Sequence, residues 1–396
     1  MTWRVPLFDT RFGPEEEEAV LRPLRAAWLT MGEEVKALEE ELAQLCGATH
    51  AIALCNCTAA LQLAAAALGL GPGDEVLCPS LTFVASASAP RQTGARIRFC
   101  DICGPDDLTL DPDALAQAIT PATKAIVAVH YAGFPCQMEA ICALAAERGL
   151  AVIEDCAHAV LSQYHGKMLG LHGNAGCFSF YSNKNITCGE GGAIITNDSA
   201  LAEKIRLMRS HGMTVPTLDR HKGHAFTYDV AMPGFNFRMD ELRAALLRAQ
   251  LKRLRGFLEQ RRHVFEWYRE RLAGSPIHMP FLGPRFRKSL STTAVHILPV
   301  LLPEGTDRAA VMEQLKAAGI QTSIHYPPVH LFSAYRDSAV RLERTEALAA
   351  RELTLPFFPR MTAADVDYVN DELLKAVARK CHHEHPLTSE TCRKGA

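Results

Sequence analysis

The stretch from residue 48 to residue 200 alternates short apolar runs with helical patterns, and this alternation limits the possible folds more than any other feature of the chain. Seven apolar runs are predicted to be strands: Ala51–Cys55, Glu75–Cys78, Arg96–Cys100, Ala125–Val129, Ala151–Glu154, Gly176–Tyr181 and Ala193–Thr196. Helical patterns lie between several of them, including Thr58–Leu68, Pro112–Ile119 and Met138–Arg148. Strands that are apolar along their whole length are covered on both faces, so the pattern predicts an α/β fold with a mostly parallel sheet between helices.

Further helices are predicted outside this stretch. Glu33–Leu45 has the pattern of a charged amphipathic helix that packs on the sheet domain or on a partner. Met239–Leu272 predicts a long helix with an apolar stripe, whose arginines alternate with glutamates on the opposite, solvated face. A predicted strand at Thr293–Leu302 and predicted helices at Arg308–Ala318 and Ala363–Ala378 indicate a smaller C-terminal α+β domain.

A chain of 396 residues is too long for one ordinary domain. We therefore predict an N-terminal segment with the large domain at residues 1–250, a smaller domain at 251–380 and a flexible tail at 381–396. The tail holds several possible metal ligands in Cys381–His385, but Pro386 and a polar end follow, so a solvated tail is the preferred interpretation.

Charge and composition argue against several classes of protein. A formal net charge of −2 does not suit a protein that binds nucleic acid or an anionic membrane. No apolar run approaches the roughly 18 residues that span a bilayer, and no apolar leader follows Met1, so a cytoplasmic protein with reduced cysteines is expected. Cys100 and Cys103 have the local spacing of a zinc motif, but no second pair stands at the right distance, and no metal is predicted.

Two polar side chains follow strands of the predicted sheet. Asp155 comes directly after Ala151–Glu154, and Lys184 stands in the polar turn after Gly176–Tyr181. Because ligands bind at the carboxyl ends of the strands in such sheets, both groups are expected at one functional edge. A primary amine can hold the aldehyde of pyridoxal phosphate as a Schiff base, and a carboxylate can keep the pyridine nitrogen protonated so that the ring accepts electrons. The alternatives are a surface lysine in a salt bridge and a carboxylate that caps the next helix.

Motifs that run nearly end to end resemble those of the DegT/StrS family of sugar aminotransferases. They are Asn56–Leu61, Gly73–Val76 with Pro79–Phe83, Val129–Gly133, Glu154–Ala159, Ser179–Gly192, Gly234–Met239 and His325–Pro328. The lysine segment, the Glu154–Asp155 pair and the Asn236 block, in that order, are the specific part. The resemblance implies the aspartate aminotransferase-like fold of type I, with pyridoxal 5'-phosphate as the cofactor and pyridoxamine 5'-phosphate in the half-reaction. Lys184 would then be both the Schiff-base lysine and the base that moves a proton at the substrate carbon.

The cofactor site implied by the resemblance consists of Thr58, Ala59, Phe83, Asp155, His158, Ser179, Lys184 and Asn236. Thr58 and Ala59 open a helix whose start suits a phosphate, and Thr58 is also expected to be the N-cap of that helix. Ser179 would supply a hydroxyl to the phosphate, Phe83 would stack on the pyridine ring, and His158 would contact the 3-oxygen or the ring face. A small strand residue, a core aromatic and a core histidine are the respective alternatives.

Other residues concern the substrate and a partner subunit. Asn236 resembles an asparagine that reaches the phosphate of the neighbouring subunit, which implies a homodimer with shared active sites. His325 and Tyr326 resemble substrate-side residues near the nucleotide-sugar entrance, and a proline-rich surface loop is the alternative. Arg238 is a candidate for a substrate contact or for an interface ion pair. Substrate-side loops, particularly Met213–Val230, contain further polar residues without an assigned role: His211, Arg220, His221 and His224.

These features together imply a transaminase that moves an amino group from an amino acid, L-glutamate, to a nucleotide-linked keto-sugar. The product would be an amino sugar for surface polysaccharide, lipopolysaccharide or a glycosylated metabolite. The segment Asn183–Gly192 resembles enzymes that act at C4 of a 4-keto-6-deoxy sugar or a 4-keto pentose. Enzymes that act at C3 carry a Gly-Asp-Gly-Gly block instead, and a 3-keto-sugar or a ketocyclitol remains an alternative acceptor. Lys184 argues against a sugar dehydratase, whose relatives carry histidine there, and Lys184 with Asp155 argues against a non-catalytic regulator.

Overall fold

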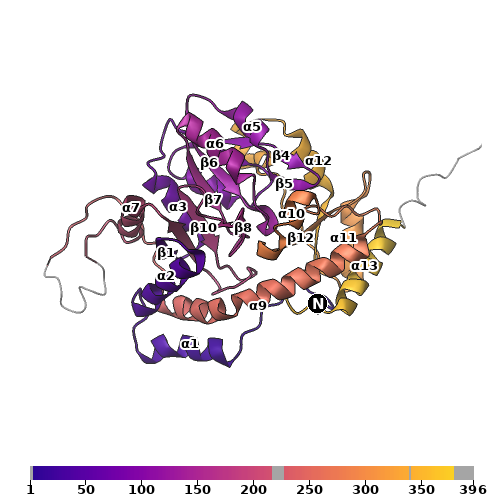
Figure 1. Ribbon diagram of the computed structural model, residues 1–396, viewed down its shortest axis with the longest axis horizontal. Helices are drawn as coiled ribbons and strands as arrows, with labels where there is room; N and C mark the ends of the chain where they lie inside the picture. Colours follow the sequence, from indigo (N-terminus) through magenta and orange to yellow (C-terminus); the bar gives the residue numbers. More distant parts are fainter. Residues whose placement is uncertain (1–2, 216–226, 339, 379–396) are drawn as a thin grey trace, which may run out of the picture.

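One seven-stranded sheet forms the centre of the molecule in the computed structural model, which describes residues 3–215, 227–338 and 340–378 (Figure 1). Its strands are β1 His50–Leu54, β2 Glu75–Pro79, β3 Arg96–Cys100, β6 Thr123–Val129, β7 Ala151–Asp155, β10 Ala175–Ser179 and β11 Gly192–Thr196. They lie in the order β1-β11-β10-β7-β6-β2-β3. β11 runs antiparallel to both neighbours, and every other pair in the sheet is parallel. The seven predicted strands and the mostly parallel sheet are confirmed.

Successive residues of each strand pack on opposite faces, which gives the sheet two separate cores. Ile52 and Leu54 of β1 belong to one core, and Ala51 and Ala53 belong to the other. The first face is covered by α3 (Cys57–Ala67), α4 (Ala85–Arg91) and α7 (Ser199–Arg209). The second face is covered by α2 (Glu33–Cys46), α5 (Pro112–Ala118), α6 (Met138–Arg148) and the first half of α9 (Glu241–Leu272). Because both faces are covered, most residues of these strands are apolar and buried.

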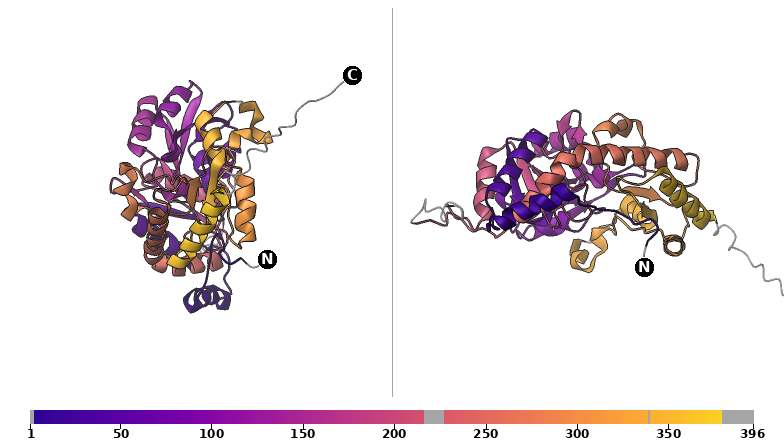
Figure 2. Two further views of the ribbon diagram at one scale, coloured as in Figure 1. Left: turned by 90° about the vertical axis from the view of Figure 1, so that its right-hand side faces the viewer. Right: turned by 90° about the horizontal axis from the view of Figure 1, so that it is seen from below.

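Helix α9 connects the large sheet to the smaller C-terminal part. It runs from α1 (Pro14–Arg25) and α2 at its beginning to α13 (Ala363–Ala378) at its end (Figures 1 and 2). Its second half packs into a third core with α11 (Arg308–Ala317), α13 and the antiparallel strands β12 (Leu298–Leu301) and β13 (Glu352–Leu355). The smaller α+β unit is therefore present as predicted. The expected boundary at residue 250 falls inside α9, so the division at that residue stays a prediction.

The strand predicted at Thr293–Leu302 is wrong at its beginning, because β12 starts only at Leu298. The residues before it direct their backbone groups elsewhere. The His296 N–H donates to the carbonyl of Ala132 at 2.8 Å, and the His296 carbonyl accepts a hydrogen bond from Arg261 at 2.9 Å. Since both backbone groups of His296 are satisfied outside a strand pair, this segment joins the two parts of the molecule instead of extending the ladder.

The remaining elements are short and were not predicted. They are β4 Ile102–Gly104, β5 Asp107–Leu110, β8 Gln163–Tyr164, β9 Lys167–Met168, α10 Pro284–Arg287, α12 Glu343–Arg351, and the 3-10 helices η1 Tyr131–Gly133, η2 Leu290–Thr292, η3 Val329–Leu331 and η4 Ser333–Ser338. Strand β4 pairs with β5, and β8 pairs with β9. Among the helices that the structure describes, none is long and apolar enough to cross a membrane. The predicted tail, with Cys381–His385, lies outside the described residues.

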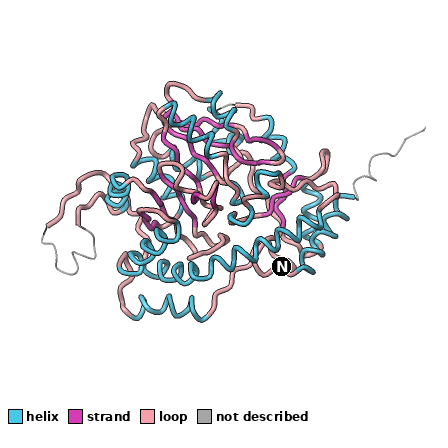
Figure 3. Tube along the Cα trace, viewed as in Figure 1, coloured by secondary structure: helices cyan, strands magenta, loops and turns pink. Residues whose placement is uncertain are grey.

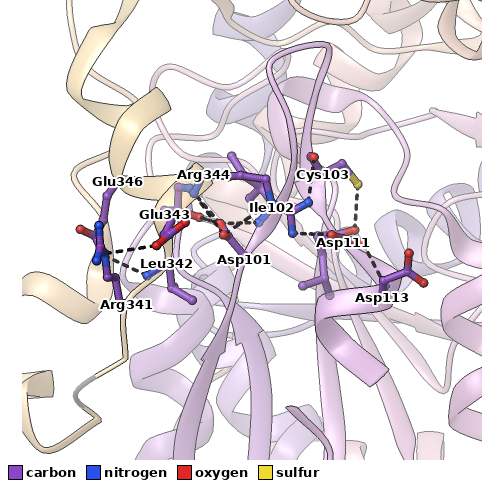
Figure 4. A network of polar contacts seen from close by, with 12 residues as sticks. Asp101, Ile102, Cys103, Asp111, Asp113, Arg341, Leu342, Glu343, Arg344 and Glu346 are labelled. Carbon is purple, nitrogen blue, oxygen red and sulfur yellow. Dashed lines mark hydrogen bonds and ion pairs between the residues drawn. The ribbon is translucent and has the colours of Figure 1, made fainter. Parts of the chain in front are cut away.

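Asp101, just after β3, holds the beginning of α12 against the large sheet (Figure 4). The N-cap residue of α12, Leu342, has no side-chain cap, and Asp101 accepts hydrogen bonds from the Thr345 N–H at 2.8 Å, the Thr345 hydroxyl at 2.7 Å and the Arg344 N–H at 3.1 Å. Arg344 also forms an ion pair with Asp111. Burial alone would raise the pKa of Asp101, but hydrogen bonds from Thr345, Ile102 and Arg344 lower it below its ordinary value of 3.8.

Asp101→Ala is therefore expected to lower the free energy of unfolding by about 1–3 kcal/mol, because it removes a cap and leaves buried donors unpaired. Urea denaturation followed by circular dichroism measures this loss. The pKa of Asp101 is lower in the folded state, so its contribution is complete above pH 3.8 and is lost as the pH falls below it. Asp106→Ala, at a side chain that is 76% exposed, is the control. Equal stabilities of the two variants would show that Asp101 does not hold α12.

Candidate active site

A cavity of about 510 Å³ lies at the carboxyl ends of β2, β6, β7 and β10. The start of α3 and the segment with His325 and Tyr326 complete its wall. It brings together eight of the residues that the sequence singled out: Thr58, Phe83, Asp155, His158, Ser179, Lys184, His325 and Tyr326. Thr58 opens α3, and the other residues of the sheet domain stand at or after the ends of parallel strands, which meet at one edge of the sheet. His325 and Tyr326 come from the segment between α11 and β13.

Lys184 lies in the turn after β10 and lines the cavity, half-buried. Its backbone N–H donates to the Tyr181 carbonyl at 2.9 Å, and its side chain makes no ion pair with a described residue. Burial lowers the pKa of the amine to about 8, although the negative charge of Asp155 acts in the opposite direction. A lysine with a lowered pKa offers a neutral, nucleophilic amine near neutral pH.

Asp155 is the last residue of β7 and is 6% exposed. One oxygen accepts from the Ser86 hydroxyl at 2.7 Å, and the other accepts from the Ala157 N–H at 3.0 Å. The Ser86 hydroxyl also contacts the Thr82 hydroxyl at 2.7 Å. The chain turns after Asp155 without forming a helix, so the alternative role as a helix cap is wrong. The carboxylate is thus fixed in position and faces a cavity that also holds an amine.

The start of α3 differs from the prediction in its N-cap. Asn56, with extended backbone angles, caps the helix through a hydrogen bond from the Ala59 N–H at 2.8 Å, so the prediction of Thr58 as the N-cap is wrong. Thr58 lies inside the first turn and lines the cavity. Gly192 of β11 allows the close packing of this turn, because a Cβ there would lie 2.3 Å from the Asn56 carbonyl carbon. The free N–H groups of a helix start attract an anion such as a phosphate.

His158 and Tyr326 meet across the cavity, since the His158 Nε2 lies 3.1 Å from the Tyr326 hydroxyl. The Ala132 N–H donates to the His158 Nδ1 at 3.2 Å, so the ring proton is on Nε2 and is donated to Tyr326. Burial, followed by the positive charge of Lys184, lowers the pKa of His158 well below its ordinary value. Phe83 is 56% exposed, so the alternative role as a core aromatic is wrong, and its ring centroid lies 5.8 Å from that of Tyr326.

Three predicted site residues do not line the cavity of the single chain. Ala59 is buried under it and contributes its N–H to the Asn56 cap. Asn236 is exposed and bridges Ser210, and Arg238 bridges Leu54 at the edge of β1. Of the polar residues around Met213–Val230, Arg220, His221 and His224 lie outside the described residues, and His211 does not line the cavity.

Other cavity residues were missed by the sequence analysis. They are Asn56, Thr82, His130, Tyr131, Tyr181, Asn183 and Glu190, among others. Most of them stand inside motifs that the resemblance rests on, so their position in the motif was the available signal. Tyr131 stands two residues after the end of β6, the neighbour of β7 in the sheet. The equivalence of neighbouring strand ends could therefore have identified it.

A cluster of possible metal ligands lies beside the cavity, where atoms of His130, Glu154 and Cys156 are within 4.8 Å of one another. Glu154 accepts hydrogen bonds from the His130 ring at 3.0 Å and from the N–H groups of Gly170 and Gly173 at 2.8 and 2.7 Å. These bonds satisfy the buried carboxylate, and the cluster is a structural network that holds β6, β7 and the turn at Gly170 together.

The groups around the cavity fit pyridoxal phosphate. They supply an amine of lowered pKa, a fixed carboxylate, a helix start for the phosphate and the exposed aromatic ring of Phe83. No single one of them is specific, but the cofactor needs this combination in one place.

Comparisons with known proteins agree with this interpretation. The sequence model of the DegT/DnrJ/EryC1/StrS aminotransferase family matches residues 11–374. Among solved structures, DesV of S. venezuelae, in complex with a ketimine intermediate, is 35% identical with a TM-score of 0.86, over 95% of this chain and 99% of DesV. DesI in the presence of its TDP-sugar product is 34% identical with a TM-score of 0.85, over 96% of this chain and 94% of DesI.

A third relative is the sugar aminotransferase Spr1654 of Streptococcus pneumoniae, which has been solved in a PLP-form and a PMP-form. The PLP-form is 27% identical to this chain with a TM-score of 0.86, over 96% of this chain and 99% of Spr1654. The likeness extends over nearly the full length of each protein, so the cavity and the smaller C-terminal part are both included.

Proposed function

Because the chain belongs to the DegT/DnrJ/EryC1/StrS family of pyridoxal phosphate-dependent sugar aminotransferases, which act on nucleotide sugars, we propose that it moves an amino group from L-glutamate to a nucleotide-linked 4-keto-sugar. The observation that carries the proposal is the presence of Lys184 and Asp155 in one cavity, with the amine pKa lowered to about 8. An amine and a carboxylate placed in this way are what amino transfer requires of the protein.

Each residue has a role that follows from its position. The cofactor, when bound, serves as an electron sink for the substrate carbon. Lys184 would attach the cofactor and, once displaced by substrate, would carry a proton to or from the substrate carbon. Asp155, fixed by Ser86 and the Ala157 N–H, would hold the proton of the pyridine nitrogen. Ser179 and the N–H group of Thr58 would hold the phosphate, and Ala59, whose N–H is taken by the Asn56 cap, would support this turn from below.

The aromatic wall would orient the cofactor ring and the sugar. Phe83 is exposed to the cavity and would stack on the ring face. His158 donates its ring proton to Tyr326, which leaves the Tyr326 hydroxyl proton for an acceptor on the substrate. His325 and Tyr326 would therefore lie on the substrate side of the cavity.

We also propose a homodimer in which Asn236 reaches the phosphate in the partner's site. Two stems, residues 211–215 and 227–234, leave the body beyond α7 and are joined by a bridge between Met213 and Val230 (Figure 3). Tyr228 and Val230 on the second stem are 50% and 53% exposed. Apolar side chains of this size on a projecting segment suit contact with a second copy of the chain. Arg238 would then serve at the interface or toward the substrate.

Asn236→Ala is expected to weaken retention of pyridoxal phosphate roughly tenfold, because one hydrogen bond to a charged group is lost. Equilibrium dialysis of the purified dimer measures the cofactor Kd. The exposed Asp229, on the stem that precedes Asn236, provides the control as Asp229→Asn. Unchanged retention in the Asn236 variant would contradict the shared site.

The ring position rests on the segment Asn183–Gly192, which resembles enzymes that act at C4. A 3-keto-sugar or a ketocyclitol is the alternative acceptor.

The eleven described cysteines are all free, which supports a reducing compartment such as the cytoplasm. The amino sugar formed would serve polysaccharide synthesis.

The experiment that tests the proposed function starts from enzyme loaded with pyridoxamine phosphate. This form is mixed with a panel of nucleotide sugars that carry the keto group at C3 or at C4, together with ketocyclitols. Recovery of the pyridoxal phosphate spectrum with 4-keto-sugars is the expected result. Recovery only with a 3-keto-sugar or a ketocyclitol would overturn the C4 assignment, and no recovery with any of them would overturn the transaminase assignment.

A further inference from the structure

His325 is connected to a buried carboxyl group that does not line the cavity. The His325 Nδ1 lies 2.8 Å from the Thr354 hydroxyl, and this hydroxyl lies 2.6 Å from the Oε1 of Glu352. The second carboxyl oxygen of Glu352 accepts the backbone N–H of His325 at 2.9 Å. Glu352 and Thr354 are each 1% exposed, and His325 is 9% exposed. The three side chains thus form a buried relay, and His325 lies at its cavity end.

The direction of these hydrogen bonds depends on the charge of Glu352. When the carboxyl is ionised, it only accepts, so the Thr354 hydroxyl donates to it and in turn accepts from His325. The ring proton of His325 is then on Nδ1, and Nε2 is an acceptor. When Glu352 is protonated, its proton sits on Oε1, because Oε2 faces the His325 N–H. The Thr354 hydroxyl must then donate to the His325 Nδ1, and the ring proton moves to Nε2.

The Nε2 of His325 makes no hydrogen bond to a described residue, and His325 lines the cavity. We propose that Glu352, acting through Thr354, sets the tautomer of His325 and thereby decides whether His325 donates a hydrogen bond to the substrate or accepts one. Glu352 and Thr354 are positioning residues in this arrangement, because only His325 faces the substrate. The proposal rests on the proposed function only for the identity of that substrate.

The charged and titratable groups around the relay favour a change of state near neutral pH. Burial raises the pKa of Glu352 to about 8, against the lowering effects of Thr354, the His325 N–H and the charge of Arg308 on α11. Tyr131 and Tyr326 also face Glu352, and burial raises the pKa of each. Burial and the charge of Lys184 lower the pKa of His325 to about 4, so the ring stays neutral while its tautomer changes.

The ring nitrogens of His325 can be followed directly by NMR of protein labelled with ¹⁵N-histidine, because the two nitrogens of a neutral imidazole differ in shift. The His325 signals are assigned by their absence in His325→Asn. The holoenzyme without substrate is expected to carry the proton on Nε2 below pH 8 and on Nδ1 above it, with the midpoint at the pKa of Glu352. A His325 tautomer that is the same at pH about 6.5 and about 9.5 would overturn the proposal.

Variants separate the relay from a structural role of the same residues. Glu352→Gln places an amide N–H where the carboxyl proton was, so His325 should keep its proton on Nε2 throughout. Thr354→Val should abolish the pH-linked change, and Thr354→Ser, which retains the hydroxyl, should restore it. A transition that persists in Glu352→Gln or in Thr354→Val would contradict the relay. These measurements need no substrate, so they can fail or succeed independently of the proposed function.

The same variants predict a kinetic effect. If His325 donates to a keto oxygen below pH 8, the half-reaction with the nucleotide keto-sugar should fall roughly tenfold above that pH in the wild type, the value of one net hydrogen bond. Because Lys184 titrates in the same range, the contribution of Glu352 is read from the ratio of the wild-type rate to the Glu352→Gln rate at each pH, and this ratio should fall roughly tenfold across pH 8. A fall of equal size in Glu352→Gln would mean that another group titrates.

Discussion

Replacing Lys184 with alanine is expected to lower the rate of amino transfer by ~10⁴-fold or more, because one side chain both attaches the cofactor and moves the proton. The lowered pKa of the amine, about 8, is the property that suits it to both tasks. Single-turnover kinetics of the half-reaction with L-glutamate, followed by absorbance, measure the loss. Cofactor can still bind through the phosphate and ring contacts, so the variant should remain folded.

Lys252→Ala is the matched control, since Lys252 is an exposed lysine on α9. It should leave the rate within about twofold of the wild type, as surface substitutions usually do. A Lys184 variant that retained a tenth of the wild-type rate would place the reacting amine elsewhere in the chain.

Asp155→Asn is expected to lower the rate by 10²- to 10³-fold, the order found when one preorganised electrostatic group is removed. Asparagine keeps the shape of the side chain and can still accept from Ser86 or Ala157, so the fold should be retained. The charge that holds the pyridine nitrogen protonated is lost, and both half-reactions should therefore slow together. Stopped-flow measurement of each half-reaction tests this point.

The exposed Asp113 provides the control for this variant as Asp113→Asn, which should have the wild-type rate. An Asp155→Asn enzyme that slowed in only one half-reaction would mean that the carboxylate acts on a substrate instead of on the cofactor. The effects of Lys184 and Asp155 should not add, because both act on the same reacting centre.

Much of the fold followed from the period of the apolar residues. The seven strands of the sheet are apolar because helices cover both faces, and that burial is visible in the sequence as continuous apolar runs. The prediction for Thr293–Leu302 was too long for a physical reason. The backbone of His296, near the beginning of this segment, forms hydrogen bonds with Ala132 and Arg261. No local sequence pattern reveals partners so far away in the chain.

The candidate site was predicted in part. Lys184 and Asp155 are found where the strand ends place them, because parallel strands end at one edge of the sheet. The N-cap of α3 is Asn56 instead of Thr58. An N-cap residue has extended backbone angles, and in this turn Asn56 has them. The contacts of His325 with Thr354 and Glu352 could not be predicted, since they come from strand β13 and carry no motif of their own.

The most direct test of the central claim, that Lys184 carries the cofactor, is reduction of the purified yellow holoenzyme with borohydride. Reduction should fix the mass of pyridoxal phosphate on the peptide that contains Lys184, which tandem mass spectrometry of the digest locates. One labelled lysine per chain, Lys184, is expected. Label on another lysine, or no covalent label on any peptide, would contradict it.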